Sequence, residues 1–396
     1  MPVSDFDVLI VGGGLAGLSL ACALRASRLR LGASRLRLAL VEQRPPRPAQ
    51  GWDARVYAIS PANRSFLQEI GIWKHLPGER LSAISAMKII GDRGSELDFS
   101  AYETGIDELG WIVESSLMAC ELWENAKRQG NLSLFCPAVP AAIEIGERAA
   151  SLDIGDDRRL TARLLVAADG RDSWVRGKVG MRAIDTPYGE LGVVANFDCQ
   201  VPHRGVARQW FRHDGVLAWL PLAGDRISIV WSAPEERERQ LLALPADALA
   251  ARVAAAGDCA LGELRLLTPA AGFPLRLLQI PQIIAPRLVL VGDAAHGIHP
   301  LSGHGINLGF QDARALASVL AAVPEWQDVG HPRFLRRYQR QRREETLLMQ
   351  ATTHALHHLF RTELPGFGML RNAGMNLTNA LPVVKNLLVR YAVGAF

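Results

Sequence analysis

The sequence predicts an α/β protein in which a parallel-sheet unit is interleaved with an antiparallel sheet and followed by C-terminal helices. Three observations predict this fold class. An apolar segment at residues 7–11 leads into a glycine-rich turn and a helix, which is the pattern of a βαβ unit. Segments of β-prone residues between 208 and 232 are separated by turn residues, which indicates antiparallel strands. No low-complexity linker divides the 396 residues, so the two units are expected to share the chain in alternating pieces.

The N-terminal unit carries a dinucleotide-binding pattern. Residues 7–11 (DVLIV) and 36–41 are typical of buried parallel strands. The signature residues are the GxGxxG glycines Gly12, Gly14 and Gly17 and, at the end of the second strand, Glu42. The glycines permit a tight turn and close approach of a pyrophosphate, and the acid accepts hydrogen bonds from ribose hydroxyls. The sequence therefore predicts a Rossmann-like unit that binds the adenosine half of a dinucleotide.

A seven-residue duplication interrupts this unit. ASRLRL occurs at residues 26–31 and again at 33–38, with Gly32 between the copies. Glu42 follows Gly12 by 30 residues, or by 23 without one copy, and the shorter spacing is nearer the usual value of about 20. We expect the extra copy to lengthen the helix end or to form a loop before the second strand. Chance repetition in an Arg/Leu-rich region is the alternative.

Two later segments also end a strand with an acidic turn. Residues 163–168 are followed by Asp169 and Gly170, and residues 288–291 are followed by Gly292 and Asp293. After the second of these, a Pro- and Gly-containing loop leads to a helix that begins near Gly305. A carboxylate can accept hydrogen bonds from a polyol, and the free N–H groups of a helix start can hold negative charge. An ordinary strand–loop–helix turn is the alternative interpretation.

Composition limits the function classes. A hydrophobic content of 49%, a net charge of +4 and a pI near 8.9 indicate a globular protein that is too weakly basic for nucleic-acid binding. The five cysteines form no CxxC pair, which argues against a disulfide framework or a zinc site. Asp5 and Asp7 precede the apolar run at residues 8–24, so it does not resemble a signal peptide. The sequence contains no uninterrupted apolar stretch of about 18 residues, so no transmembrane helix is predicted. A cytoplasmic location is expected.

The three elements together resemble a known family. GGGLAG with Glu42, AADGRDSWVR at 167–176 and VGDAAHGIHP at 291–300 stand in the order found in FAD-dependent aromatic hydroxylases of the para-hydroxybenzoate hydroxylase type. Within that group, the chain is most similar to the ubiquinone-biosynthesis hydroxylases of bacteria and mitochondria, over nearly its whole length. The resemblance implies an FAD-binding domain of the glutathione-reductase type. It also implies NAD(P)H and O2 as co-substrates and hydroxylation of a prenylated phenol through a C4a-hydroperoxyflavin.

The resemblance also implies the residues that contact FAD. The glycine motif would face the pyrophosphate, Glu42 the adenosine ribose and Asp293 the ribityl–phosphate side. A helix N-terminus at 303–308 would stabilise the negative charge of the reduced flavin. The full implied set is Gly12, Gly14, Gly17, Glu42, Arg55, Asp169, Gly170, Gly292, Asp293, Pro300, Gly303, Gly305, Ile306 and Asn307.

Two positions depart from the family pattern. His304 replaces a Gln and Ser115 replaces an Asn. Pro300 and His304 are the candidates for the flavin and substrate environment, and His304 could tune the flavin, touch the substrate or only replace a hydrogen-bonding amide. His296, His299 and His304 resemble a metal cluster, but their loop carries the flavin motif, so no metal is expected and His296 is expected to orient the loop.

The substrate is expected between the flavin and the antiparallel sheet. The candidates for that wall are Trp210, Phe211, Trp219, Leu220 and Pro221, and the alternative is that most of them are core residues of the sheet. The expected division of the chain is FAD-binding domain at 1–80, 113–180 and 277–330, substrate domain at 81–112 and 181–276, and a helical region at 331–396.

Other functions and partners remain open at this stage. The alternatives are a monooxygenase of a small soluble phenol or polyketide, and a non-catalytic flavin-binding scaffold in a biosynthetic complex. The WxWxIP signature of flavin halogenases is absent from the sequence. The basic residues 333–343 and the apolar residues 381–396 suit peripheral contact with the inner face of a membrane. A solvated helix face, a homo-oligomer contact or a surface for other ubiquinone-biosynthesis proteins explains the arginines equally well.

Overall fold

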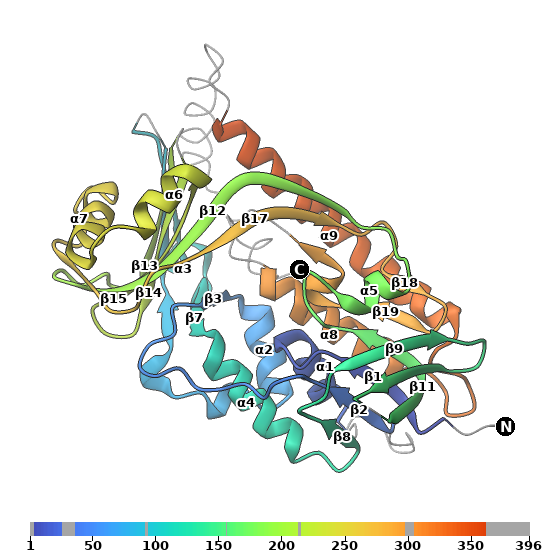
Figure 1. Ribbon diagram of the computed structural model, residues 1–396. Coiled ribbons are helices and arrows are strands. Elements are labelled where there is room, and N and C mark those ends of the chain that lie inside the picture. Colours follow the sequence, from blue (N-terminus) through green and yellow to red (C-terminus); the bar gives the residue numbers. More distant parts are fainter. Residues whose placement is uncertain are drawn as a thin grey trace.

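The chain folds around two large sheets, seen in a computed structural model (Figure 1). The structure describes residues 4–25, 36–91, 94–155, 157–212, 215–297 and 305–361, with side chains up to 355. The duplicated segment falls largely outside these ranges, so the prediction about it stays open.

The first sheet has the topology of a nucleotide-binding domain. Its strand order is β18-β19-β11-β1-β2-β8, with β10 and β9 continuing from β11. The central pairs are parallel and both faces of the sheet are buried, which explains why these strands are continuous apolar runs. The strands are β1 (Phe6–Val11), β2 (Leu38–Val41), β8 (Leu132–Phe135), β9 (Pro140–Ile145), β10 (Ala150–Ile154), β11 (Arg158–Ala167), β18 (Ile284–Ala285) and β19 (Leu288–Leu290).

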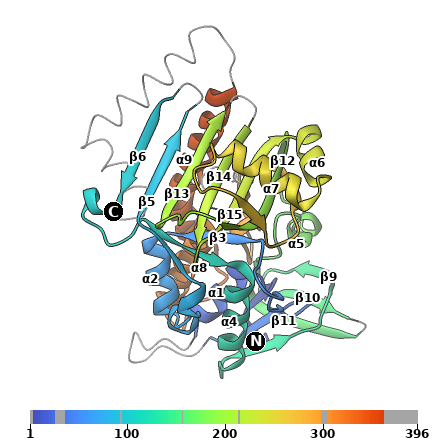
Figure 2. The ribbon, with the colours of Figure 1, turned by 90° about the vertical axis from the view of Figure 1, so that its left-hand side faces the viewer.

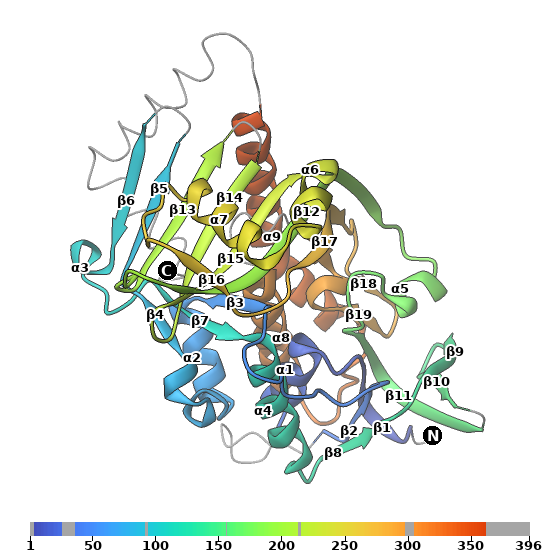
Figure 3. The ribbon, with the colours of Figure 1, turned by 60° about the vertical axis from the view of Figure 1, so that its left-hand side comes forward.

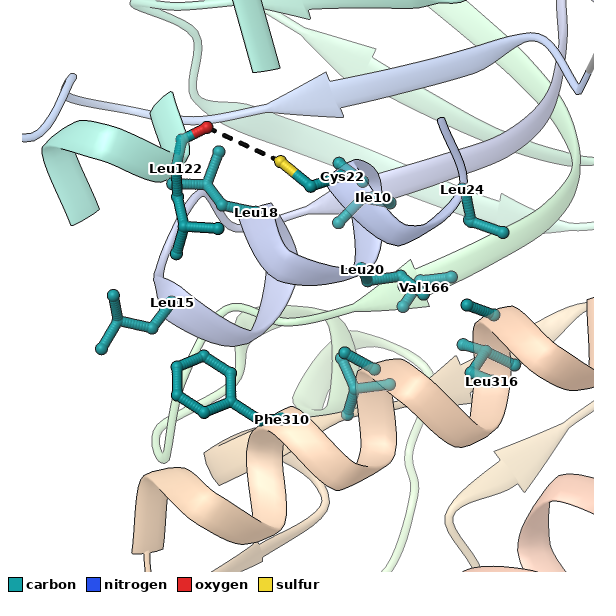
Figure 4. Packing of buried hydrophobic residues seen from close by; sticks show 14 of the residues in the cluster. Ile10, Leu15, Leu18, Leu20, Cys22, Leu24, Leu122, Val166, Phe310 and Leu316 are labelled. Carbon is teal, nitrogen blue, oxygen red and sulfur yellow. Dashed lines mark hydrogen bonds between the residues drawn. The ribbon is translucent and has the colours of Figure 1, made fainter. Parts of the chain in front are cut away.

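Side chains of β1 alternate between two cores. Val8 and Ile10 pack with helices α1 (Leu15–Ala23), α4 (Ser115–Lys127) and α8 (Gly305–Ala321), whereas Leu9 and Val11 pack with β10 and α5 (Trp174–Lys178). Figure 4 shows the helical side, where Leu18 and Leu20 of α1 lie against Phe310 and Leu316 of α8. The Cys22 thiol donates to the Leu122 carbonyl in the same core. The close α1–α8 contact brings the first and third sequence motifs together.

The second sheet is mainly antiparallel and has the strand order β20-β17-β12-β15-β14-β13-β5-β6, with β16 paired to β12. Figure 3 shows the long strand β12 running from α5, beside the first sheet, into the second sheet. The strands are β5 (Ala86–Ile90), β6 (Glu96–Ser100), β12 (Ile184–Cys199), β13 (Val206–Arg212), β14 (Gly215–Leu222), β15 (Arg226–Pro234), β16 (Leu264–Leu266), β17 (Ala271–Gln279) and β20 (His296–Gly297). Helices α6 (Glu235–Leu242) and α7 (Ala246–Ala256) cover one face, and α9 (Pro332–Arg361) lies on the other side (Figure 2).

A small third sheet joins the two large ones. It contains β3 (Val56–Ile59), β7 (Gly110–Glu114) and β4 (Ser82–Ile84) and is flanked by α2 (Pro61–Glu69). Ile84 and Ile112 of this sheet pack against Leu220 and Leu222 of the second sheet. The remaining short helices are α3 (Ala101–Thr104), η1 (Trp73–His75), η2 (Gly78–Arg80) and η3 (Gly292–Ala294).

The predicted fold class is confirmed. The chain passes from the first sheet to the second and back twice, so the two units are interleaved. Among the described helices, none has the length and apolar character needed to span a membrane.

Candidate functional site

The three motif glycines of the first turn meet three different steric conditions. Gly12 has φ of +107°, and a Cβ there would lie 2.4 Å from the Ala168 carbonyl oxygen. A Cβ at Gly17 would lie 2.1 Å from the Gly12 oxygen, whereas a Cβ at Gly14 would meet no atom within 4 Å. Gly12 therefore makes the turn, Gly17 brings the helix against the loop, and Gly14 leaves the start of α1 open. These conditions match the three glycine roles in dinucleotide binding.

Glu42 lies against the same loop. Its carboxylate accepts hydrogen bonds from the Gly13 N–H at 2.5 Å and the Arg44 N–H at 3.0 Å. The acid at the end of β2 and the glycine turn after β1 thus lie side by side, as a βαβ nucleotide site requires.

Asp169 stabilises the turn after β11. Its carboxylate accepts hydrogen bonds from the Ser173 hydroxyl at 2.6 Å and the Val175 N–H at 3.0 Å, and so it holds the start of α5. Gly170 has φ of +85°, a left-handed conformation that favours glycine. Because Ala168 donates to the Val11 carbonyl, this second motif lies beside the first one.

The third motif, at Gly292 and Asp293, lies against Ala16 of α1. Gly292 has φ of +61°, and a Cβ there would lie 2.9 Å from the Ala16 side chain. Asp293 is exposed, although residues 291, 292 and 294–297 around it are buried. An exposed carboxylate in a buried turn can accept hydrogen bonds from a bound polyol without protein competition.

Arg55, Tyr57 and Asp293 form one electrostatic group. The Arg55 guanidinium lies 5.5 Å from the centre of the Tyr57 ring. Burial raises the pKa of the Tyr57 phenol, the Arg55 charge opposes that shift, and the Asp293 carboxylate adds to it. A hydrogen bond from Ser115, the position that departs from the family pattern, also lowers this pKa. Tyr57 therefore lies within electrostatic range of both Arg55 and Asp293, and the position of Arg55 near the flavin stays a prediction.

Asn307 is the best-connected predicted residue at the start of α8. Its Nδ2 donates to the Ala58 carbonyl at 2.7 Å, and its Oδ1 accepts from the Ser60 N–H at 3.0 Å and from Asn63 Nδ2 at 2.8 Å. Its side chain thus joins α8 to β3 and α2. Gly305 and Ile306 are partly exposed, and a Cβ at Gly305 would meet no atom within 4 Å.

A buried charged cluster lies behind this motif. His296 Nε2 is 2.6 Å from Asp312 Oδ2, and Arg342 Nε is 2.7 Å from Asp312 Oδ1. Burial opposes ionisation of Asp312, but His296 and Arg342 hold its pKa below the usual value. This contact fixes the His296 side chain, and its expected role in orienting the loop stays a prediction, because residues 298–304 lie outside the described residues. In the described part of the chain, no group of three His, Cys, Asp or Glu side chains could hold a metal ion. Pro300, Gly303, His304 and His299 lie outside the described residues.

Sequence reasoning missed the roles of Asp312 and Arg342. Arg342 lies in an arginine-rich stretch whose other members are exposed, but it follows the buried Leu335 and Tyr338 at helical spacing, and this spacing is the signal that could have distinguished it.

Trp210 and Trp219 lie in the core between the second sheet and α7. Their rings are 4.8 Å apart in an edge-to-face arrangement, and both are nearly fully buried. Trp210 Nε1 donates to Asp258 at 2.8 Å, and a Cβ at Gly257 would lie 2.0 Å from the Trp219 ring. Pro221 lies on the same face as Trp219, since they are two residues apart on β14. Trp210, Trp219 and Pro221 therefore face α7, whereas the candidates Phe211 and Leu220 alternate to the opposite face of the sheet.

The opposite face of the second sheet carries a different row. Cross-strand pairing places five side chains together on it, here called the inner row: Ile89, Gln209, Ala218, Val230 and Val194. The four apolar members are partly exposed and, among the described residues, belong to none of the hydrophobic cores. The next row on this face includes Leu220, which packs on the third sheet, and Asn196, whose Nδ2 donates to the Asp53 carbonyl at 2.8 Å. The inner row thus lies on the face of the second sheet that contacts the third sheet and the Asp53 segment, opposite α7.

Comparison with known proteins identifies the family. The profile of the FAD binding domain family matches residues 122–352. Ubiquinone hydroxylase UbiL of Rhodospirillum rubrum is 34% identical over 98% of this chain and 89% of that protein. The 3-demethoxyubiquinol 3-hydroxylase of Escherichia coli is 30% identical over 98% of both chains. The crystal structure of p-nitrophenol 4-monooxygenase PnpA from Pseudomonas putida shares the fold, with a TM-score of 0.78, 18% identity and 98% of each chain covered.

The glycine turn, the adjacent Glu42 and the exposed Asp293 fit FAD, and the family match agrees with them. The predicted resemblance and cofactor are confirmed, while the individual contact residues remain predictions. The chain belongs to the FAD-binding ubiquinone hydroxylase family and is an FAD-dependent monooxygenase.

Proposed function

We propose that the protein hydroxylates the aromatic ring of a prenylated phenol, a precursor of ubiquinone, using NAD(P)H and O2. Bound FAD supplies the redox chemistry and the oxygen activation. The single observation that supports this substrate class most is the inner row, a partly exposed and uncharged surface on the face of the second sheet opposite α7.

The residues of this chain divide the work between binding and exclusion of water. The glycine turn and Glu42 hold the adenosine and pyrophosphate, and Asp293 holds the ribityl side. The inner row positions the ring and its apolar substituent and keeps water from the reacting atoms, which matters because water diverts the oxygen to hydrogen peroxide.

The row also bears on the main alternative, a small soluble phenol. A charged substrate such as a carboxylated phenol needs a partner charge when it leaves water. None of the five residues of the inner row is charged, which favours a neutral, apolar substrate.

The test is complementation of bacterial strains that each lack one ring hydroxylase of ubiquinone synthesis. Restored quinone in one strain, with loss of its accumulated precursor by mass spectrometry, supports the proposal and identifies the ring position. Failure in every strain, with the holoenzyme expressed and flavin-loaded, contradicts it.

We also propose peripheral contact of α9 with an anionic membrane surface. Arg336, Arg340 and Arg343 recur at helical spacing on exposed positions of α9, and the exposed Leu347 follows on the same face. Basic residues above an apolar one suit anionic headgroups. Charge reversal of Arg336 and Arg340 should abolish sedimentation with anionic liposomes, and wild-type protein that does not sediment with them contradicts the proposal.

A further inference from the structure

The exposed carboxylate of Asp293 lies between two backbone groups that are held by buried charged side chains. On one side, the Gly292 N–H donates to Asp312 Oδ2 at 2.9 Å. On the other, Arg176 Nη1 donates to the Ala294 carbonyl at 2.9 Å. Asp312 is 0% exposed and Arg176 is 8% exposed. Both neighbours of Asp293 in the chain are therefore fixed, while its own side chain is left exposed.

Each buried group also ties this turn to a different part of the molecule. Arg176 Nη2 donates to the Arg171 carbonyl at 2.7 Å, in the segment that follows Asp169 and Gly170. Asp312 contacts His296 at the other end of the short turn and Arg342 on α9. Arg342 in turn reaches Gln311 Oε1 at 3.1 Å. The turn at residues 292–296 is thus joined to the second motif, to α8 and to α9.

Burying these charged side chains has a high desolvation free energy. A buried carboxylate and two buried or nearly buried cations are expensive to desolvate, and replacing such groups by apolar residues is often neutral or stabilising. General stability is therefore a weak explanation for these charges, whereas fixing one backbone geometry uses their directional hydrogen bonds.

We propose that Asp312 and Arg176 are positioning residues that set the orientation of Asp293 toward FAD. Neither needs to touch the cofactor. The proposal rests on Asp293 as an FAD ligand, and it is independent of which phenol is hydroxylated.

The test measures FAD affinity of the apoprotein by flavin fluorescence, together with the melting temperature of the apoprotein. Asp312→Asn keeps the side-chain shape but cannot accept all of the present hydrogen bonds. We expect it to weaken FAD binding between about tenfold and a hundredfold, the range for charged hydrogen bonds. Arg176→Lys, which cannot reach both carbonyls with one fork, should weaken binding in the same direction.

Asp328→Asn is the matched control. Asp328 is also paired with arginines, Arg287 at 2.6 Å and Arg163 at 3.4 Å, and its pKa is also lowered from the usual value, although burial opposes that shift. It holds the connection before α9 and makes no contact with the three motifs among the described residues. Asp328→Asn should lower the melting temperature and leave the FAD dissociation constant unchanged.

A double-variant cycle with Asp293→Asn decides the mechanism. If Asp312 acts through Asp293, the double variant should bind FAD within about threefold of Asp293→Asn alone. Multiplied losses in the double variant would overturn the proposal, as would an Asp312→Asn protein that melts lower but binds FAD normally. No FAD binding by wild-type apoprotein would instead contradict the FAD assignment itself.

Discussion

The nucleotide-binding turn and the inner row of the second sheet form their surfaces in opposite ways. At the turn, backbone meets backbone, and a single added Cβ at Gly17 would lie 2.1 Å from an oxygen. On the second sheet, side chains form the surface, and the apolar members of the inner row are partly exposed. The first region therefore tolerates almost no change, whereas changes in the second should alter substrate preference without affecting the cofactor.

The largest effect is expected at the turn. Gly17→Val places a branched side chain where the Gly12 carbonyl and Ala168 already lie. We expect loss of bound FAD, measured as the flavin-to-protein absorbance ratio after purification. Gly130→Ala is the control, because a Cβ there meets no protein atom within 4 Å and Gly130 lies outside the three motifs. Gly130→Ala should keep its flavin, and flavin-loaded Gly17→Val would contradict the steric explanation.

Trp219→Ala tests the outer face of the second sheet. The ring is fully buried against α7, so its removal should cost about 3–5 kcal/mol of unfolding free energy. Urea unfolding measures this cost. A stable variant with impaired substrate binding would return Trp219 to the substrate wall that the sequence suggested.

Glu238→Gln tests the packing of α6 on the outer face of the second sheet through the pH dependence of stability. Burial is the main cause that raises the pKa of Glu238 from 4.5 to about 8; Arg237 opposes the shift and Glu190 adds to it. The folded state then holds a proton that the unfolded state releases, so stability should fall as pH rises from about 5 to 8. Glu238→Gln should flatten this decline in unfolding free energy. Parallel pH profiles for the two proteins would show that Glu238 ionises freely.

Asn307→Ala tests the junction of α8 with β3 and α2. It leaves the Ala58 carbonyl and the Ser60 N–H without their partner and should cost about 2–3 kcal/mol. Asn131→Ala is a matched control, because Asn131 also joins two backbone carbonyls, those of Leu24 and Leu36, but does so away from the motifs. Flavin release at lower temperature in Asn307→Ala alone supports a site role, and equal behaviour of both variants argues against one.

Ala218→Phe should give the smallest and most selective effect. Ala218 is the direct neighbour of Trp219 but faces the inner side. A ring there should lower kcat/KM for the phenol by about tenfold or more and leave the FAD dissociation constant unchanged. Substitution of the outer residue Ala233 by Phe is the control, and it should lower stability instead. Unchanged kcat/KM in Ala218→Phe would exclude the inner row from the substrate site.

The nucleotide-binding half of the fold could be predicted from the sequence because its signals are local. Within one βαβ unit, the sequence pattern predicts a turn at Gly12, Gly14 and Gly17 and a strand end at Glu42. The structure brings these residues together. Asp293 follows its own strand in the same way, although its distance from Arg55 depends on tertiary packing.

The buried and exposed faces of the second sheet were harder to predict from sequence, because they depend on the register of the strands. A shift of one residue along β14 exchanges the inner and outer faces. Trp219 was a candidate because its ring is large, but its neighbour Ala218 is the residue that lies on the inner face. The buried partners of the third motif were inaccessible for another reason. Asp312 and Arg342 each lie on the apolar stripe of a helix, but the two helices are separate, and the sequence does not show that the two charges pair with each other.

Isotopic oxygen tests most directly whether the protein hydroxylates a prenylated phenol. The flavin-loaded protein is supplied with NAD(P)H, a prenylated phenol and ¹⁸O2, and the product is weighed by mass spectrometry. We expect one ¹⁸O atom per product molecule, in a new ring hydroxyl. NAD(P)H consumption that yields only hydrogen peroxide with every prenylated phenol offered, or product oxygen derived from water, would contradict it.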